Sequence, residues 1–235
     1  MLKFKSFILT LGQLTIIPAL ILIPFIDNNL FLTLSSILLS FIFGVFGWNL
    51  AQHRYFTHKQ FKVKRYVEQL LSIVAVLGTW QSPIEWSAIH HKHHKYADTE
   101  DDIHSPIYHG WRNWFFFFHN IKEFDMNMTV GRLAVDTWHI AILKLKYFII
   151  IFYALLSYML LGLEGLTYLW LIPTAYSFLS QMIIVNNHSE QGAKNSLIAN
   201  IITFGEGNHK DHHDNPRSHE DSALLKPLIK ILENA

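Results

Sequence analysis

The sequence predicts an all-α integral membrane protein in which four transmembrane helices, arranged as two hairpins, carry a helical cytosolic cap. Of its 235 residues 51% are hydrophobic and only 16% are charged, well below the roughly 25% of soluble domains. Four stretches contain no Asp, Glu, Lys or Arg, and each approaches the ~20 residues that cross a ~30 Å hydrocarbon core. These predicted spans are residues 7–26, 30–52, 147–163 and 165–187.

Short polar links separate the two spans of each hairpin. Asp27-Asn-Asn29 divides the first pair and Glu164 divides the second. The first span also has features of a signal peptide, because Lys3 and Lys5 precede it. It is long for the apolar region of such a peptide and lacks a small-x-small cleavage site. We therefore interpret it as a retained span.

The distribution of charge predicts the orientation. With four spans, all nineteen Lys and Arg lie in the N-terminus, in the segment 51–146 or after residue 188. The positive-inside rule places that side, with both termini, in the cytosol. We expect one membrane domain over residues 1–235, with its cytosolic cap at about 53–146 and 188–235. The composition, rich in Lys, Ile and Asn, favours a bacterial or viral source, and hence the plasma membrane (the inner membrane if the source is bacterial) over the endoplasmic reticulum.

Other features exclude some classes of function and predict two further helices. A net charge of +1 gives no sign of a nucleic-acid partner, and we expect none. Because the chain has no Cys, it forms neither disulfides nor Cys-ligated iron–sulfur clusters. The apolar stretch Leu70–Ile84 is too short to cross a membrane, so we expect a helix in the interface or beneath the cap. An amphipathic helix is predicted at Ser222–Leu232.

Three clusters of His indicate a metal centre on the cytosolic side. Two of them have i, i+3, i+4 spacing, which points three rings at one place on a helix. The first cluster has two His five residues apart, and these need an uneven or unwound turn to face the same way. A lone His directly follows the fourth span and lies at the same depth as the first cluster. The nine candidate ligands are His53, His58, His90, His93, His94, His188, His209, His212 and His213.

Nine imidazoles exceed the needs of one ion and suit two. A site walled by nitrogen ligands beside a bilayer fits a redox metal acting on an apolar substrate, and iron is the predicted choice. Metal-bound His usually donate their second N–H to a carboxylate. The acidic residues beside the clusters are Asp98, Glu100, Asp101, Asp102, Glu190, Glu206, Asp211 and Asp214, of which Asp98, Glu190 and Glu206 are the predicted partners.

These motifs resemble those of the membrane-bound fatty-acyl desaturases, specifically the stearoyl-CoA (Δ9 acyl) desaturase type. The resemblance covers about residues 40–216. It rests on GWNLAQHRYFTH at 47–58, Trp86 before the second cluster, HHKYADT at 93–99, HSP at 104–106 and GEGNHKDHH at 205–213. It implies four spans, a cytosolic cap and a di-iron (Fe2+/Fe3+) centre held by the same nine His.

The resemblance also implies positions that contact the substrate. Trp80, Gln81 and Trp86 are candidates for a bent acyl tunnel, and His104 matches a position near the substrate head group. The family commonly has an Asn four residues before the lone His, where this chain has Ile184. Asn186 and Asn187 are the candidates to replace it.

The implied activity is introduction of a cis double bond, at Δ9, into a long-chain acyl group with consumption of O2. The acyl group is carried by CoA, acyl-carrier protein or a membrane lipid. Electrons are expected from a separate ferredoxin, or from cytochrome b5 with its reductase. A di-iron lipid hydroxylase or ketolase is the main alternative. A His-rich metal transporter is a further one, although the spans have no His or carboxylate in their interiors to form a pathway.

Overall fold

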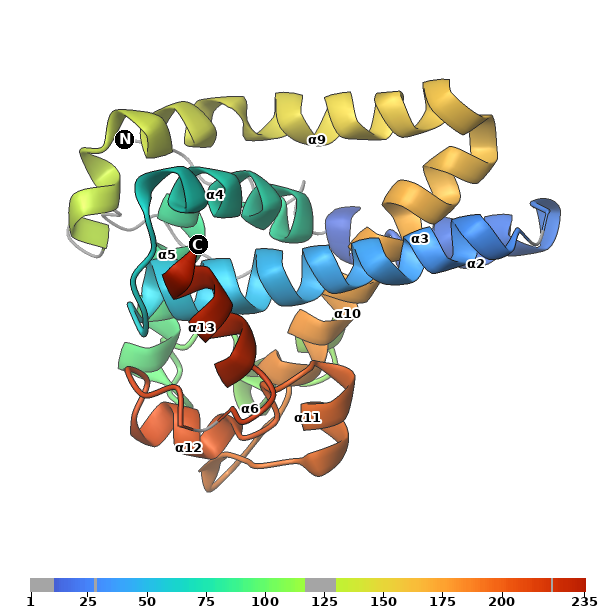
Figure 1. The fold of residues 1–235 in the computed structure, drawn as a ribbon. Coiled ribbons are helices and arrows are strands. Elements are labelled where there is room, and N and C mark those ends of the chain that lie inside the picture. The colour runs from blue at the N-terminus through green and yellow to red at the C-terminus, as the bar shows by residue number, and fades with distance from the viewer. Residues whose placement is uncertain (1–10, 28, 117–129, 221) are drawn as a thin grey trace.

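The computed structural model describes residues 11–27, 29–116, 130–220 and 222–235. Residues 7–10 of the first predicted span lie outside these ranges. The described chain is mostly helical (Figure 1), as predicted. Its only strands in these ranges are β1 (His188–Ser189) and β2 (Gly192–Ala193), which pair antiparallel.

The region of the first predicted hairpin contains α2 (Ile16–Leu22), the short helix η1 (Ile23–Phe25) and α3 (Leu30–Phe41). Asn29 caps α3 by accepting the amide of Leu32, as expected for a residue that satisfies a free N–H at a helix start. Helix α3 continues without a break into η2 (Ile42–Thr57), which has π-helical hydrogen bonding.

The second predicted hairpin is formed by α9 (Thr137–Gly165), η4 (Leu166–Leu171) and α10 (Ile172–Val185). The chain turns back near the right-hand end of α9 in Figure 1. The turn occurs at Gly162, whose φ of 60° and ψ of −140° form a conformation that is essentially restricted to glycine. This reversal lies two residues before Glu164, where the sequence predicted the link.

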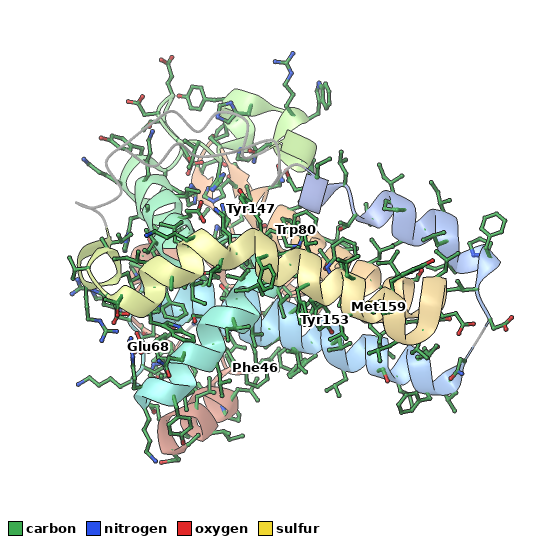
Figure 2. The ribbon with its side chains drawn as sticks, turned by 90° about the horizontal axis from the view of Figure 1, so that it is seen from above. Phe46, Glu68, Trp80, Tyr147, Tyr153 and Met159 are labelled. Carbon is green, nitrogen blue, oxygen red and sulfur yellow. The ribbon has the colours of Figure 1, made fainter. Side chains whose placement is uncertain are left out.

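Two helical segments are long and apolar enough to cross a membrane, namely Leu30–Thr57 and Thr137–Val185. The segment Leu11–Phe25 is apolar but shorter. Figure 2 shows labelled side chains along α9, from Tyr147 to Met159 at its far end, and Tyr153 packs against Phe43 of η2 with ring centroids 5.7 Å apart.

Helix α9 begins ten residues before the predicted third span. Asp136 caps its start by accepting the amides of Trp138 and His139. Lys146, which precedes the predicted span, is buried and donates to Glu85 of α5 (Pro83–Tyr96). A buried, paired charge is compatible with a helix interior, and the sequence alone did not indicate this pairing.

The apolar stretch predicted as one helix over Leu70–Ile84 is two helices. Helix α4 (Arg65–Thr79) ends where Trp80 adopts the left-handed conformation, with φ of 57°. Helix α5 then begins at Pro83 with a capping box, in which Ser82 and Glu85 satisfy each other's backbone amides. Helix α4 packs between η2 and α9 (Figure 1), and its residues Leu71, Ala75 and Val76 are buried, whereas Leu70 is exposed.

The remaining short elements surround the end of this bundle where α4 and α5 lie. The C-terminal helix begins at Lys226 rather than the predicted Ser222, and Ile229 and Leu232 of this helix are buried. The remaining short elements are α6 (Pro106–His109), α7 (Arg112–Phe116), η3 (Gly131–Ala134), α11 (Leu197–Ile202), α12 (His209–Asp214) and the C-terminal helix α13 (Lys226–Asn234).

Candidate metal centre

The π-helical turn of η2 explains how two His five residues apart face the same way. The amide of His58 donates to the carbonyl of His53 at 3.2 Å, which is the i→i+5 bond of a π-helix. Thr57 repeats this spacing with its hydroxyl, which donates to the carbonyl of Gln52 at 2.7 Å. The rings of His53 and His58 consequently lie 4.9 Å apart, centroid to centroid. The uneven turn that the sequence required is therefore present.

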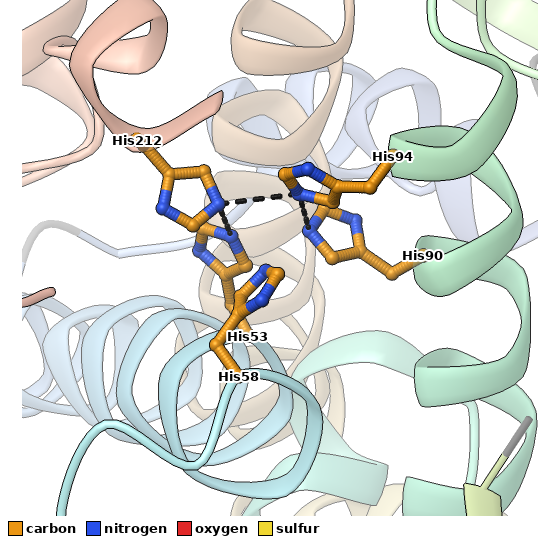
Figure 3. A group of neighbouring side chains, drawn as sticks. All are labelled: His53, His58, His90, His94 and His212. Carbon is orange, nitrogen blue, oxygen red and sulfur yellow. Dashed lines mark hydrogen bonds between the residues drawn. The ribbon is translucent and has the colours of Figure 1, made fainter. Parts of the chain in front are cut away.

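The structure brings all nine predicted His together, in two groups. In each group the candidate ligand nitrogens all lie within 4.8 Å of one another. The five-His group is formed by His53, His58, His90, His94 and His212, and the four-His group by His93, His188, His209 and His213. Figure 3 shows the five-His group, with rings that converge from η2, α5 and α12.

The helical clusters are divided between the two groups. On α5, His90 and His94 belong to the five-His group, whereas His93 belongs to the four-His group. On α12, His212 belongs to the five-His group and its neighbour His213 to the four-His group. The sequence predicted the nine residues but not this division, because spacing along one helix does not define where a second helix lies.

Ring nitrogens approach one another closely inside both groups. In the five-His group, Nε2 of His53 lies 2.9 Å from that of His212, and Nε2 of His90 lies 3.0 Å from that of His94. In the four-His group, the Nε2 atoms of His188 and His209 are 3.0 Å apart. Two neutral ring nitrogens at this distance repel each other unless a proton or a cation lies between them.

Carboxylates lie close to the Nδ1 atoms of three of the nine rings, and two of these rings belong to the four-His group. Nδ1 of His93 donates to Asp102 at 2.9 Å, and Nδ1 of His188 lies 3.1 Å from both oxygens of Asp98. A partner at Nδ1 fixes the tautomer and leaves Nε2 with its lone pair directed inward. Asp98, which the sequence predicted as a partner of a His ligand, therefore contacts His188. Asp102, which was among the acidic candidates but was not selected, makes the equivalent contact.

Glu206, another predicted partner, contacts both a ring of the five-His group and a cation. Its Oε2 lies 2.9 Å from Nδ1 of His53, and its Oε1 accepts from Nε of Arg54 at 2.6 Å. Burial raises the pKa of Glu206, but Arg54 and His53 outweigh this and lower it to about 2. The carboxylate is therefore charged.

Arg54 is a residue that the sequence reasoning missed. Its side chain is fully buried, and it also bonds to the side-chain oxygens of Asn49 and Gln60. A charged residue is costly to bury without partners. Its position in the sequence could have identified it, because Arg54 directly follows His53 and is the one charged residue between positions 30 and 58.

The remaining predicted partners lie elsewhere. Glu190 is exposed in the turn between β1 and β2. The side-chain amide of Asn186 donates to the carbonyl of Met182, and that of Asn187 donates to the carbonyl of Lys194. Neither Asn is among the residues that line the pocket beside the His groups, whereas Ile184 is.

This pocket, called the apolar pocket below, lies against both groups. It contains two of the four predicted substrate residues, Trp86 and His104. Trp80 instead stacks on Trp170 with ring centroids 5.8 Å apart, and Gln81 is buried and accepts from Gln52 through its backbone carbonyl. The pocket is lined by Trp48, His53, Trp86, His90, His93, His104, Ile184, Val185 and His209.

The chemistry of the nine side chains fits metal ions. Burial, with help from neighbouring imidazoles, lowers the pKa of His58, His90, His209 and His212 well below the usual value, so these rings are neutral and can donate a lone pair. Nε2 of both His58 and His213 is buried without a hydrogen-bond partner among the described residues. Such orphaned nitrogens are the ligands that a transition metal prefers.

Among the described His outside the nine, His109, His139 and His219 belong to neither group. His109 bonds to the carbonyl of Asp102, and His139 is fully buried against Glu68 at 2.9 Å. His219 is partly exposed. His119 lies outside the described residues.

Comparison with known proteins adds a family and several relatives. The family model described as fatty acid desaturase matches residues 29–222. An acyl-CoA 5-desaturase of Anemone leveillei is 27% identical over 191 residues, which are 76% of this chain and 60% of that protein. A Δ9 acyl-lipid desaturase of Arabidopsis thaliana is 25% identical over 205 residues, 78% of this chain and 65% of the relative.

A bacterial relative has a similar degree of identity. The sn-1 stearoyl-lipid 9-desaturase of Anabaena variabilis is 28% identical over 197 residues, 76% of this chain and 70% of that protein. For the two plant relatives, the match spans less than two thirds of their own length.

Proposed function

Because this chain belongs to the fatty acid desaturase family, we propose that it introduces a cis double bond, at Δ9, into a long-chain fatty-acyl group. The reaction removes one hydrogen from each of two neighbouring methylenes. With one O2, two electrons and two protons, it yields the alkene and two molecules of water. The acyl group is carried by CoA, acyl-carrier protein or a membrane lipid, and the electron donor is a ferredoxin or cytochrome b5 with its reductase.

The observation that carries this proposal is the position of the apolar pocket. His53 and His90 of the five-His group line it together with His93 and His209 of the four-His group. Trp48, Trp86 and Ile184 provide apolar walls. A methylene placed against these walls would face residues of both groups, and this is the position that we propose for the reacting part of the acyl chain.

We propose that each group holds one iron ion through the nine His. Two bound irons would supply the O2-derived oxidant that an unactivated methylene needs. Asp98 and Asp102 keep the Nδ1 protons of their His partners outward, and Glu206 faces Nδ1 of His53. The charge of these three carboxylates offsets part of the positive charge that two ions would bring.

The walls of the pocket have a separate role in positioning the chain. The ring of Trp86 stacks on His90 with centroids 5.9 Å apart and an angle of 17°. A rigid indole beside a ligand ring limits where the chain can lie, and positioning of this kind sets the position of the new double bond. His104, on the same pocket, is the proposed contact for the substrate head group.

We propose the four-span arrangement for the membrane part and one domain over residues 1–235. The exposed apolar side chains of α3 and α9 support it, because a soluble protein rarely exposes so large an apolar surface. Gly162 interrupts the long segment Thr137–Val185, and we propose that the parts before and after it each cross the membrane. The termini and the His groups then face the cytosol, at the plasma (inner) membrane if the source is bacterial.

The test is expression in a host that lacks its own desaturase, followed by mass spectrometry of its acyl chains. We expect new monounsaturated chains with the double bond at Δ9. Bonds at another position would correct the regiochemistry and leave the reaction class intact. Hydroxy acids without alkenes would select the hydroxylase.

A further inference from the structure

A second pocket lies against the five-His group. It shares no lining residue with the apolar pocket. His58 and His94, both of the five-His group, form part of its wall, and no residue of the four-His group does. This pocket, called the basic pocket below, is lined by Thr57, His58, Lys59, His91, His94, Pro216 and Arg217.

The rim of the basic pocket is cationic. Lys59 and Arg217 are exposed, and among the described residues neither forms an ion pair. They come from two segments far apart in the sequence, directly after η2 and after α12. Lys95, also exposed, lies one turn beyond His91 on α5, so it shares the face that His91 turns to the pocket.

Two of the described acidic side chains on the segment that carries Arg217 are paired with other cations. Asp214, at the end of α12, pairs with Lys210 at 3.1 Å. Glu220, farther along the same segment, pairs with Lys226. Neither of these two carboxylates pairs with Lys59 or Arg217, whose exposed charges attract an anionic partner through solvent.

We propose that the basic pocket is the docking surface for an acidic one-electron carrier protein, such as a ferredoxin. The inference rests on the proposed function, which requires two electrons for each double bond. Two reduced carriers would dock in turn, and each would lose one electron to the centre. The rings of His58 and His94 are the members of the five-His group that lie nearest the docked partner.

The two routes keep the electron donor and the acyl chain apart. The acyl chain would reach the groups through the apolar pocket, whereas of the nine His only His58 and His94 line the pocket at which the carrier docks. A double bond can therefore form without release of the chain between the two electron deliveries. Charge complementarity at the rim governs mainly the rate of encounter and is weakened by salt.

The test uses the full-length protein loaded with iron, with an acidic plant-type [2Fe–2S] ferredoxin as probe. Lys59→Glu and Arg217→Glu are combined in one variant, and the control is Lys230→Glu, an exposed Lys on α13. Ferredoxin binding is measured directly by biolayer interferometry at low and high salt. Formation of the double bond is measured as a function of ferredoxin concentration.

We expect the double variant to bind ferredoxin roughly tenfold more weakly at low salt, with KM for ferredoxin raised by a similar factor. Its kcat at saturating ferredoxin should match the wild type, and Lys230→Glu should change neither quantity. Weaker binding of the wild type at high salt, with little further change in the double variant, would support the same surface.

Unchanged ferredoxin binding in the double variant would overturn the proposal. A raised KM for the acyl substrate alone would also overturn it and would assign the pocket to the acyl carrier. If ferredoxin binding depends on these charges but the wild type forms no double bond with any donor, the docking surface stands and the desaturase assignment fails.

Discussion

Arg54 donates to Glu206 at 2.6 Å across 152 positions of sequence, and neither side chain is accessible to solvent. This pair joins η2 to the loop that precedes α12, so it links the elements that carry His53 and His212. Breaking one partner of a buried pair leaves an uncompensated charge, which costs about 3–5 kcal/mol. The pair is therefore part of the support of the five-His group.

The first prediction is that Glu206→Gln lowers iron affinity by roughly 10- to 100-fold, because the carboxylate that faces His53 and Arg54 is lost. Iron bound per protein would be measured by mass spectrometry during titration with a chelator. The matched control is Glu190→Gln, the same change at an exposed site. Equal iron affinity in the two variants would contradict the role given to Glu206.

The second prediction concerns the division of the nine His. We expect His58→Ala and His188→Ala each to lower bound iron from two ions towards one and to abolish activity, because they remove ligands from different groups. His94→Ala and His212→Ala should behave as His58→Ala does. Iron content by plasma mass spectrometry, with unfolding temperature beside it, separates ligand loss from misfolding.

The control for these variants is His109→Ala, which should retain both ions. His139→Ala is unsuitable because His139 is fully buried and bonds to Glu68, so its removal lowers stability for another reason. Two ions retained in His188→Ala would show that this residue is not a ligand.

The third prediction tests the π-helical turn. Thr57→Ala removes the bond from the Thr57 hydroxyl to the buried carbonyl of Gln52 and should destabilise the protein by about 1 kcal/mol. Thr57→Ser keeps the hydroxyl and should recover most of this loss. The measurement is thermal unfolding in detergent. Equal unfolding temperatures for the two variants would mean that the bond does not stabilise the turn.

The fourth prediction is a dependence on pH at the start of α9. A hydrogen bond from Arg65 is the main cause that lowers the pKa of Asp136 to about 2, although burial opposes it. A carboxyl with a lowered pKa stabilises the fold above its unfolded pKa of about 3.9 and ceases to do so as pH falls towards 2. Asp136→Asn should therefore lower the unfolding temperature at pH 7.

The difference between wild type and Asp136→Asn should narrow as the pH is lowered from about 4 to 2. Asn still caps a helix, so this comparison reports the charge and not the cap. A difference that is independent of pH would show that the ionised carboxylate is not the stabilising form.

Much of the centre could be predicted because its ligands follow local rules. The i, i+3, i+4 spacing predicted that His90, His93 and His94 share one face of a helix, and α5 has this form. The assignment of His93 to a different group depends on where α12 lies. That position is determined by contacts between segments far apart in the sequence.

The missed features share a physical cause. Charged residues usually lie at the surface, yet Arg54 and Lys146 are both buried and paired with acidic residues distant in sequence. Such pairing cannot be recognised from local composition. The position of the chain reversal near Glu164, in contrast, was predicted within two residues because a polar link between apolar stretches is a local signal.

The division of neighbouring ligands between groups has a mechanical consequence. His93 and His94 belong to different groups, and so do His212 and His213. One step along an α-helix advances the backbone by about 1.5 Å and turns it by about 100°. The helices α5 and α12 therefore fix the distance between the two groups independently of any loop. A change in either helix alone cannot widen that spacing without straining the other.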